Sequence, residues 1–461
     1  MNLPCDFEQS IAAHLGQEEY DRLSEALSLP APTSIRLNQE KAEQSELETL
    51  QYAEGVPWCA GGFYLKERPQ FTFDPLFHAG CYYVQEASSM FLSHVLRQYI
   101  DKPVVALDMC AAPGGKSTLA LSQLPEGSLL VANEAIRQRA SILAENITKW
   151  GNPNCIVTSN YAEDFHAFGG VFDLIICDAP CSGEGMFRKD PASIEEWSLA
   201  NVEACRKRQR DIVSNIWHTL KEGGIFIYST CTYNQKENEE NVEWMLQTLG
   251  AEALPCNPMP EWNLTDKNTH FYPHKNKGEG FFISVLRKTS ESSESERGRK
   301  KKEKGNKKGK PTAKIPAELQ NWLTDSQAFT FTEENGTYQA FPTPFIDLLQ
   351  LAKATLKVIH AGIGMATLKG KSLQPCQSLA MSQSLNRQAF PAEDVTLQQA
   401  IAYLRSESLQ LSETAPRGYV LITYQDHPLG FAKNIGNRAN NLYPAEWRIK
   451  KAGVQIPASR N

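Results

Sequence analysis

The segment Val104-Val-Ala-Leu-Asp-Met-Cys-Ala-Ala-Pro-Gly-Gly-Lys-Ser117 gives the strongest indication of the fold of this chain. Its apolar start, Val104 to Met109, predicts a buried strand, and a helix is expected from Ser117 to Leu124. The Pro-Gly-Gly sequence between the two lets the backbone turn tightly and approach a ligand closely. The helix would then present free N–H groups to a polar or anionic group. A loop of this kind is typical of a site for a nucleotide-like ligand.

An alternation of strands and helices continues from this stretch as far as Lys288. Further strands are expected at Leu129–Glu134, Cys155–Thr158, Phe172–Cys177, Ile225–Tyr228 and Phe281–Leu286. Helices are expected at Ala135–Trp150, with Ile136, Ala140, Leu143 and Ile147 on one face, at Ile194–Leu220 and at Lys236–Leu249. This alternation predicts an α/β fold with a parallel, doubly wound sheet. Ligands bind such sheets at the carboxyl ends of the strands.

Five segments are expected: an N-terminal α+β accessory domain, the α/β domain, a charged linker, a mixed accessory region and a β-rich C-terminal module. Their boundaries are 1–95, 96–288, 289–312, 313–395 and 396–461, in that order. The linker is predicted to be flexible because Glu291 to Lys310 contains no large apolar residue that could bury surface. The C-terminal module is predicted from two short strands, Gly418–Tyr424 and His427–Phe431.

The composition is that of a folded protein without a strong overall charge. The chain has 461 residues, 41% of them hydrophobic, and a net charge of −6, so any contact with nucleic acid must come from local patches. Its 11 cysteines include no C-x-x-C pair, and we expect no structural zinc site. The sequence shows no signal peptide and no apolar run of about 18 residues. We therefore expect a cytoplasmic protein with reduced thiols and no membrane span.

Two kinds of nucleotide cofactor compete for the glycine-rich loop. Its end, Gly115-Lys116-Ser117, fits a phosphate-binding loop, but Cys110 stands where that loop needs its first glycine, and Asp108 adds an acidic group. Glu134 ends the second strand, where a carboxylate can accept hydrogen bonds from ribose hydroxyls. Asn160 follows the third strand, where it could reach an adenine. These residues favour S-adenosylmethionine over ATP, and a nicotinamide cofactor is disfavoured because Gly-x-Gly-x-x-Gly is absent. The alternative is an ordinary tight turn without a ligand.

Two cysteines stand just beyond the ends of two predicted strands. Cys181 lies in Asp178-Ala-Pro-Cys-Ser-Gly-Glu184, and Cys231 lies in Ser229-Thr-Cys-Thr-Tyr233. A single cysteine is most often a small buried hydrophobe, and this interpretation suits the other cysteines of the domain, Cys110, Cys155, Cys177 and Cys205. Two thiols in matching positions at one edge of a sheet indicate covalent chemistry, with one thiol attacking and the other helping release.

A methyl donor beside two thiols indicates an electron-poor acceptor such as cytosine. Carbon 5 of cytosine is a weak nucleophile, but a thiolate that adds to carbon 6 activates it. After methyl transfer, a base must remove the proton on carbon 5 so that the thiolate can leave. Asp178 could hydrogen-bond the ring nitrogen or the amino group. The attacking thiol needs a lowered pKa or a nearby base, and a helix that starts near Lys236 could help if its N-terminus faces Cys231.

At these residues the sequence resembles the RNA 5-methylcytosine methyltransferases of the Sun family. The resemblance rests on Asp108–Thr118, Asp178–Met186 and Ser229–Tyr233, which agree in order and spacing with the family's three signature motifs, and on Gly80–Met90. It implies a Rossmann-like methyltransferase domain that uses S-adenosylmethionine. It also implies that Cys231 is the nucleophile and that Cys181 aids release of the product.

The resemblance further implies a set of residues at or near the cofactor. They are Cys110, Ala111, Ala112, Pro113, Gly114, Gly115, Lys116, Glu134, Asn160 and Asp178. Asn160 departs from the family, which often has aspartate at this position. The C-terminal residues between Thr423 and Pro444 resemble the PUA-like RNA-binding module of members that methylate 16S ribosomal RNA.

The expected function is methylation of carbon 5 of cytosine in 16S ribosomal RNA by a monomer without a metal ion. Candidate contacts with the RNA backbone are Arg36, Arg417, Lys433 and Arg438. Three alternatives stay open: the same chemistry on transfer RNA, a non-catalytic RNA-binding factor of ribosome assembly, and a nucleoside-triphosphate enzyme.

Overall fold

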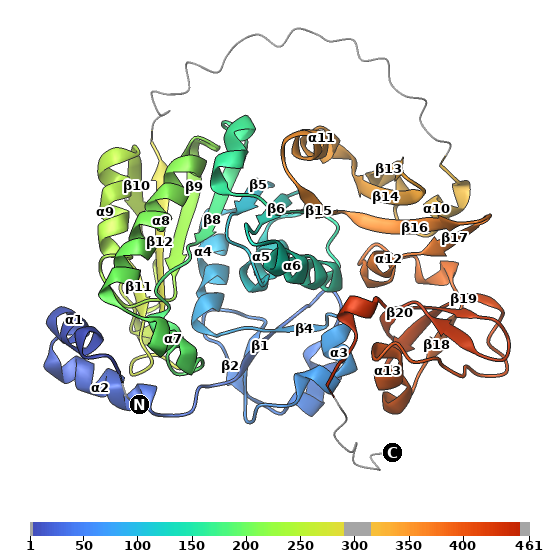
Figure 1. The fold of residues 1–461 in the computed structure, drawn as a ribbon, viewed down its shortest axis with the longest axis horizontal. Helices are drawn as coiled ribbons and strands as arrows, with labels where there is room; N and C mark the ends of the chain where they lie inside the picture. The colour runs from blue at the N-terminus through green and yellow to red at the C-terminus, as the bar shows by residue number, and fades with distance from the viewer. Residues whose placement is uncertain (1–2, 290–314, 452–461) are drawn as a thin grey trace, which may run out of the picture.

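The computed structural model describes residues 3–289 and 315–451 (Figure 1). The expected linker at 289–312 lies outside these residues, apart from its first position. The described residues form a central nine-stranded sheet and three four-stranded sheets, one from the N-terminal region and two from the region beyond the linker. The predicted fold class, an α/β domain with an N-terminal α+β domain and a β-rich C-terminal module, is confirmed.

The central sheet is mixed. In spatial order its strands are β10 (Ala251–Leu254), β12 (Phe281–Lys288), β9 (Leu220–Thr230), β8 (Phe172–Asp178), β5 (Val105–Asp108), β6 (Leu129–Asn133), β7 (Cys155–Thr158) and β15 (Val358–Ala361), with β11 (Thr269–Phe271) paired to β12. The strands from β9 to β7 are parallel, as expected. The strand at Phe281–Leu286 was also expected to be parallel, and this prediction is wrong, because β12 pairs antiparallel with both β9 and β10. A parallel return would need a long crossover, and no α-helix lies between β10 and β12.

Helices cover both faces of the central sheet, as in a doubly wound fold. One face carries α4 (Leu92–Tyr99), α5 (Gly115–Gln123) and α6 (Arg137–Trp150), and the other carries α8 (Leu199–Trp217), α9 (Glu239–Thr248) and α11 (Ile346–Thr355). Successive strand residues supply the two cores, since Leu174 and Ile176 of β8 pack on the first face and Ile175 on the second. This buried layer holds the carboxyl ends of the strands in place.

Two expectations for the helices are wrong. The single helix expected at Ile194–Leu220 is two helices, because α7 (Pro191–Glu196) ends before Ser198, whose hydroxyl accepts a hydrogen bond from the N–H of Asn201 and starts α8. Ile136 was expected on the buried face of α6 and is 55% exposed, because it precedes the first helical residue. The other three residues of that face are buried.

Part of the α/β domain comes from beyond the linker. Strand β15 pairs with β7 at the edge of the central sheet, and α11 packs Leu349 and Ala352 into the core of the second face. The expected mixed region at 313–395 therefore contributes to two layers. Most of its other elements form a separate sheet with two short helices, namely β13 (Phe329–Glu334), β14 (Thr337–Pro342), β16 (Ile363–Lys369), β17 (Ser372–Pro375), α10 (Ala317–Asn321) and α12 (Gln377–Met381), whereas the strand at Ala392–Asp394 joins the C-terminal sheet.

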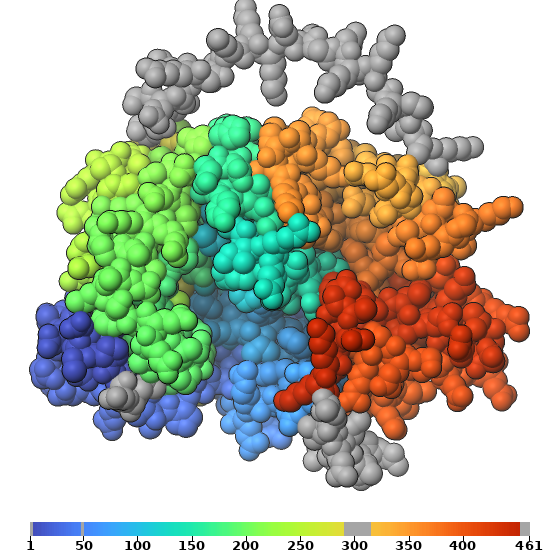
Figure 2. All heavy atoms as spheres, in the orientation of Figure 1, coloured from blue at the N-terminus to red at the C-terminus, as the bar shows by residue number. Residues whose placement is uncertain are grey.

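The two ends of the chain pack against each other. The N-terminal domain consists of α1 (Cys5–Leu15), α2 (Gln17–Leu27), β1 (Ser34–Leu37), β2 (Tyr52–Gly55), β3 (Gly62–Leu65), α3 (Pro75–His78) and β4 (Tyr82–Val84). The C-terminal module consists of β18 (Ala392–Asp394), α13 (Leu397–Leu404), β19 (Gly418–Tyr424), β20 (His427–Asn434) and β21 (Ala439–Asn441). Ile35 and Tyr82 of the first belong to one hydrophobic cluster with Val420 and Leu429 of the second. Figure 2 shows the C-terminal module, in red, directly against the N-terminal half of the chain.

Among the described residues, no helix combines the length and the apolar character that crossing a membrane requires.

Candidate active site

The two thiols lie side by side at the carboxyl edge of the central sheet. Strands β8 and β9 are parallel neighbours and are paired as far as Asp178 and Ser229, so the loops that follow them leave the sheet together. The Sγ atoms of Cys181 and Cys231 are 3.2 Å apart, and the N–H of Cys231 donates to Cys181 Sγ at 3.3 Å. The structure thus brings together the two cysteines that the sequence singled out.

The loop after Cys181 folds closely over the loop that carries Cys231. The N–H of Gly185 donates to the carbonyl oxygen of Cys231 at 2.8 Å. A Cβ atom at position 185 would lie 2.9 Å from that same oxygen, so a larger residue would push the loops apart. Glycine at this position therefore sets the spacing of the two thiol loops.

Cys181 is the proton-holding member of the pair. Its hydrogen bond with Cys231, followed by burial, raises the pKa of the Cys181 thiol well above its usual range. Cys181 therefore keeps its proton near neutral pH, and its thiol can take part in a hydrogen bond with the sulfur of Cys231.

A buried polar cluster that the sequence did not predict joins the two thiol loops. Its members are Glu184, Asn234 and Glu237, here called the carboxylate clamp. The Nδ2 of Asn234 donates to Glu184 Oε1 at 3.0 Å and to Glu237 Oε1 at 2.8 Å. Glu237 Oε2 accepts from the N–H of Ser182, next to the first cysteine, at 3.0 Å. Burial raises the pKa of both glutamates. The clamp fixes the position of one thiol relative to the other.

The segment after Cys231 was expected to start a helix near Lys236 whose N-terminus could face the thiol, and it does not do so. The helix predicted near Lys236 is α9, which begins at Glu239 with Asn238 as the preceding cap. What this segment brings to the thiol loops is the carboxylate of Glu237 and not a helix N-terminus. The sequence signal that could have identified the clamp is the short spacing of each glutamate from a cysteine.

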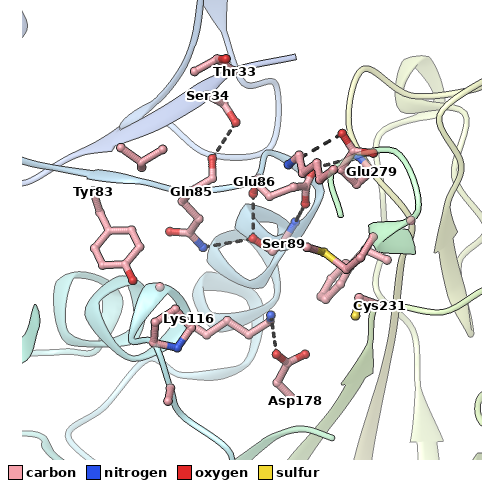
Figure 3. A pocket seen from close by; sticks show the side chains of 18 of the residues that line it. Thr33, Ser34, Tyr83, Gln85, Glu86, Ser89, Lys116, Asp178, Cys231 and Glu279 are labelled. Carbon is pink, nitrogen blue, oxygen red and sulfur yellow. Dashed lines mark hydrogen bonds and ion pairs between the residues drawn. The ribbon is translucent and has the colours of Figure 1, made fainter. Parts of the chain in front are cut away.

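A cavity of about 450 Å³ opens beside Cys231, between the α/β domain and the N-terminal domain (Figure 3). Its N-terminal wall includes Thr33, Ser34, Tyr83, Val84, Gln85 and Glu86. Its opposite wall is the glycine-rich loop with Asp178, and Gly280 and Phe281 complete it beside Cys231. The cavity therefore joins the expected cofactor loop to the expected nucleophile.

An ion pair crosses the floor of this cavity. Figure 3 shows Lys116 and Asp178 pointing toward one another, with 2.8 Å between Nζ and Oδ2. The hydroxyl of Ser229 donates to the other carboxylate oxygen of Asp178 at 2.8 Å. Burial lowers the pKa of Lys116 and the Asp178 carboxylate raises it, with a net rise, so the ammonium stays charged. Both predicted residues are thus held in fixed positions at the site.

The glycine-rich loop has the expected course. Every candidate residue from Cys110 to Lys116 lines the cavity except Gly114, which has φ +119° and faces α6. Beneath the loop, the hydroxyl of Ser117 donates to Asp108 Oδ2 at 2.6 Å, whereas Oδ1 of this fully buried residue has no hydrogen-bond partner among the described residues. Burial raises the pKa of Asp108 to about 7.

The other two cofactor candidates, Glu134 and Asn160, do not line this cavity. Glu134 is buried at the end of β6, where Oε1 accepts from the N–H of Ile136 at 3.0 Å and Oε2 lies 3.3 Å from Arg139. The side chain of Asn160 is engaged within the protein, since its Oδ1 accepts from a backbone N–H at 2.9 Å and its Nδ2 donates to Asp164 at 2.9 Å.

Arg36 is wrong as an RNA contact. It is buried, its Nε donates to Gln85 at 2.8 Å, an Nη donates to Thr118 at 2.6 Å, and the guanidinium lies over the ring of Trp150. Through these contacts Arg36 joins the N-terminal domain to α5 and α6, and they compensate part of the cost of burying its charge. The exposed candidates are Arg417 and Arg438, with Lys433 half-buried over the ring of Tyr419.

Three family models match the chain in succession. They are the N-terminal domain of 16S rRNA methyltransferase RsmF at residues 3–87, 16S rRNA methyltransferase RsmB/F at residues 100–287, and the methyltransferase RsmF PUA domain at residues 391–449. The models cover the N-terminal domain, most of the α/β domain before the linker, and the C-terminal module, whereas residues 315–390 lie outside all three.

Curated relatives match over nearly the whole length. Ribosomal RNA small subunit methyltransferase F of Escherichia coli (strain SE11) is 31% identical over 93% of this chain and 92% of its own length. The protein of the same name from Aliivibrio fischeri (strain MJ11) is 30% identical over 95% of both chains.

Solved structures share the fold. A methyltransferase homolog protein from Pyrococcus horikoshii has a TM-score of 0.51 at 28% identity and covers 59% of this chain and 91% of its own. NSun6 from the same organism, in a structure with SFG, has a TM-score of 0.54 at 22% identity and covers 62% of this chain and 98% of its own. The chain therefore belongs to the 16S rRNA methyltransferase RsmB/F family, as a member of its RsmF group, and its methyl donor is S-adenosylmethionine.

Proposed function

We propose that this methyltransferase modifies carbon 5 of a cytosine in 16S ribosomal RNA through a temporary covalent bond from Cys231. The observation that carries the proposal is the contact between Cys231 and Cys181, 3.2 Å apart, where Cys231 forms part of the wall of the cavity beside the glycine-rich loop. Methyl transfer to nitrogen or oxygen needs no thiol, because those atoms have lone pairs. Transfer to a pyrimidine carbon requires prior addition of a nucleophile.

The reaction consists of forming and breaking one carbon–sulfur bond. The Cys231 thiolate adds to carbon 6, and the electron pair of the ring double bond moves to carbon 5, which takes the methyl group. A base then removes the proton from carbon 5, the double bond re-forms and the carbon–sulfur bond breaks with its electron pair returning to sulfur. The Cys181 thiol, whose Sγ lies 3.2 Å from that of Cys231, donates a hydrogen bond to the departing thiolate and so aids release.

Lys116 and Asp178 orient the ring. Both groups face the cavity as an ion pair at 2.8 Å. A carboxylate accepts hydrogen bonds and an ammonium donates them. Asp178 is therefore suited to the amino group of cytosine and Lys116 to the ring carbonyl. Uracil would present a carbonyl oxygen where cytosine presents the amino group, which would face the carboxylate unfavourably.

The residues along the strand ends fit S-adenosylmethionine, which supplies an activated methyl group when bound. The cavity lining from Cys110 to Pro113 leaves room for a ligand against the loop. The Glu134 carboxylate directly follows β6, where it can accept from ribose hydroxyls. Ile136, 55% exposed directly beyond it, offers an apolar surface to an adenine.

The substrate is proposed from the whole length of the chain. Relatives named ribosomal RNA small subunit methyltransferase F match the N-terminal domain and the PUA domain as well as the catalytic domain, which favours 16S ribosomal RNA over transfer RNA. We propose that the protein acts as a monomer, as expected from the sequence. A reaction through reduced thiols on ribosomal RNA favours the cytoplasm.

Bisulfite sequencing of RNA tests the proposal. Cells with the protein should contain a protected cytosine in 16S RNA, and cells without it, or with only the Cys231→Ala variant, should lack that protection. If loss of the protein left the protected cytosines of 16S RNA unchanged and altered those of transfer RNA, 16S RNA would not be the substrate. No change in either RNA would contradict methylation at carbon 5.

A further inference from the structure

The chain beyond the linker reaches the methyl-donor side of the site through Lys357, which directly precedes β15. The carbonyl oxygen of Lys357 accepts from the N–H of Ser159 at 2.9 Å. Its own N–H donates to Oδ1 of Asn160 at 2.9 Å. These two bonds extend the pairing of β15 with β7 into the loop that follows β7, where Asn160 lies.

Asn160 connects Lys357 to the glycine-rich loop through hydrogen bonds with Asn133. Its N–H donates to Oδ1 of Asn133 at 3.1 Å, and its carbonyl oxygen accepts from Asn133 Nδ2 at 2.9 Å. Asn133, the last residue of β6, also donates from Nδ2 to the carbonyl oxygen of Met109 at 3.1 Å, and its own carbonyl oxygen accepts from the N–H of Ala111 at 2.8 Å. A continuous set of hydrogen bonds therefore runs from Lys357 to the start of the loop at 110–116.

These hydrogen bonds lie in a buried part of the protein. Asn133 is fully buried and Asn160 is 9% exposed, so water does not readily replace a lost partner. Without β15, β7 would be the open edge of the central sheet, and its backbone groups would lack partners on that side. The loop after β7 would then have only its contacts with β6 and Asp164 to hold it.

We infer that the backbone N–H of Lys357 and the side chain of Asn160 position the cofactor half of the site, so that residues beyond the linker are required for tight binding of S-adenosylmethionine. In this account Asn160 is a positioning residue and not a ligand of the adenine, because both ends of its amide are used within the protein. The inference rests on the proposed placement of the cofactor against residues 110–116 and Glu134.

Two substitutions at one position separate the backbone contact from the side chain. Lys357→Pro removes the N–H donor, whereas the matched control Lys357→Ala keeps it. Leu356 is already extended, with φ −119° and ψ 160°, as a residue before proline prefers. Calorimetry with S-adenosylmethionine on the full-length protein should show a Kd about 5- to 10-fold weaker for Lys357→Pro, the effect of one lost hydrogen bond, and an unchanged Kd for Lys357→Ala.

Steady-state kinetics distinguish positioning from a general loss of structure. For Lys357→Pro, the KM for S-adenosylmethionine should rise by the same factor, with kcat and the KM for RNA within about twofold of the original, because the thiols are untouched. Asn160→Ala removes the same bond to the N–H of Lys357, together with the bond from Asn160 to Asp164, and should show the same pattern, so it decides the question if Lys357→Pro does not fold. Cofactor binding by Asn160→Ala as tight as that of the unsubstituted protein would overturn the inference. Failure of the unsubstituted protein to bind S-adenosylmethionine would instead contradict the proposed function.

Discussion

The two halves of the site are stabilised in different ways. The thiol half consists of the loops after β8 and β9, and the carboxylate clamp that joins them lies entirely within the α/β domain before the linker. The cofactor half consists of the loops after β5, β6 and β7, and its outer loop is bonded to Lys357, from beyond the linker.

The difference shows which part of the reaction depends on local geometry. In the proposed mechanism, bond formation and release need two sulfur atoms held at one distance, and the carboxylate clamp, close in sequence to both cysteines, holds them there. In our inference, cofactor binding depends on the contact between the loop after β7 and Lys357. We therefore expect substitutions in the thiol half to lower kcat, and substitutions in the cofactor half to change affinity for S-adenosylmethionine.

Removing the nucleophile should have the largest effect. Cys231→Ala should lower the rate of methyl transfer to 16S RNA on the order of 10⁴-fold, as is common when a covalent nucleophile is lost. The affinity for S-adenosylmethionine should stay the same, because the loop at 110–116 is unchanged. Transfer of a labelled methyl group, together with calorimetry, measures both quantities. An equal fold loss in the rate of methyl transfer and in the affinity for S-adenosylmethionine would contradict the division of the site into two halves.

Breaking the carboxylate clamp should have an intermediate effect. Asn234→Ala removes the donor shared by Glu184 and Glu237 and leaves buried acceptors without it. The thiols would shift relative to one another, and kcat should fall about 10²-fold with no change in cofactor affinity. Asn215→Ala, an exposed asparagine on α8, is the matched control and should be neutral. A normal kcat for Asn234→Ala would show that the clamp does not position the thiols.

A smaller effect is expected for the carboxyl beneath the glycine-rich loop. Burial raises the pKa of Asp108 from 3.8 to about 7, so between these values the folded protein holds a proton that the unfolded chain releases. Stability should therefore fall as pH rises from 4 to 7, by about 2 kcal/mol between pH 5 and pH 7. Asp108→Asn does not titrate, and its urea unfolding should lack this loss. Identical pH dependence in both proteins would contradict the buried, protonated state of Asp108.

The sequence was sufficient to predict the parts of the site that obey local rules. Strand order in a doubly wound sheet places successive strand ends at one edge, and this brought Cys181, Cys231 and Asp178 together as expected. The glycine-rich loop was predictable because tight turns need particular residues at particular positions.

The parts that it did not predict depend on contacts between distant segments. A short strand such as β15 carries little periodicity of its own, and its pairing with β7 follows from tertiary packing. Arg36 looks like a surface charge in the sequence, and only the fold shows that Gln85 and Thr118 surround it. Glu184 and Glu237 are as common in solvated loops as in buried clusters, so their burial could not be read from residue type.

The central claim is that Cys231 forms the bond to the RNA and that Cys181 assists its cleavage. The Cys181→Ala variant should be incubated with S-adenosylmethionine and 16S RNA, digested with nuclease and protease, and analysed by peptide mass spectrometry. We predict that a methylated cytosine nucleotide accumulates on the peptide that contains Cys231. Absence of any protein–RNA adduct in this variant, or an adduct on a cysteine other than Cys231, would contradict the mechanism.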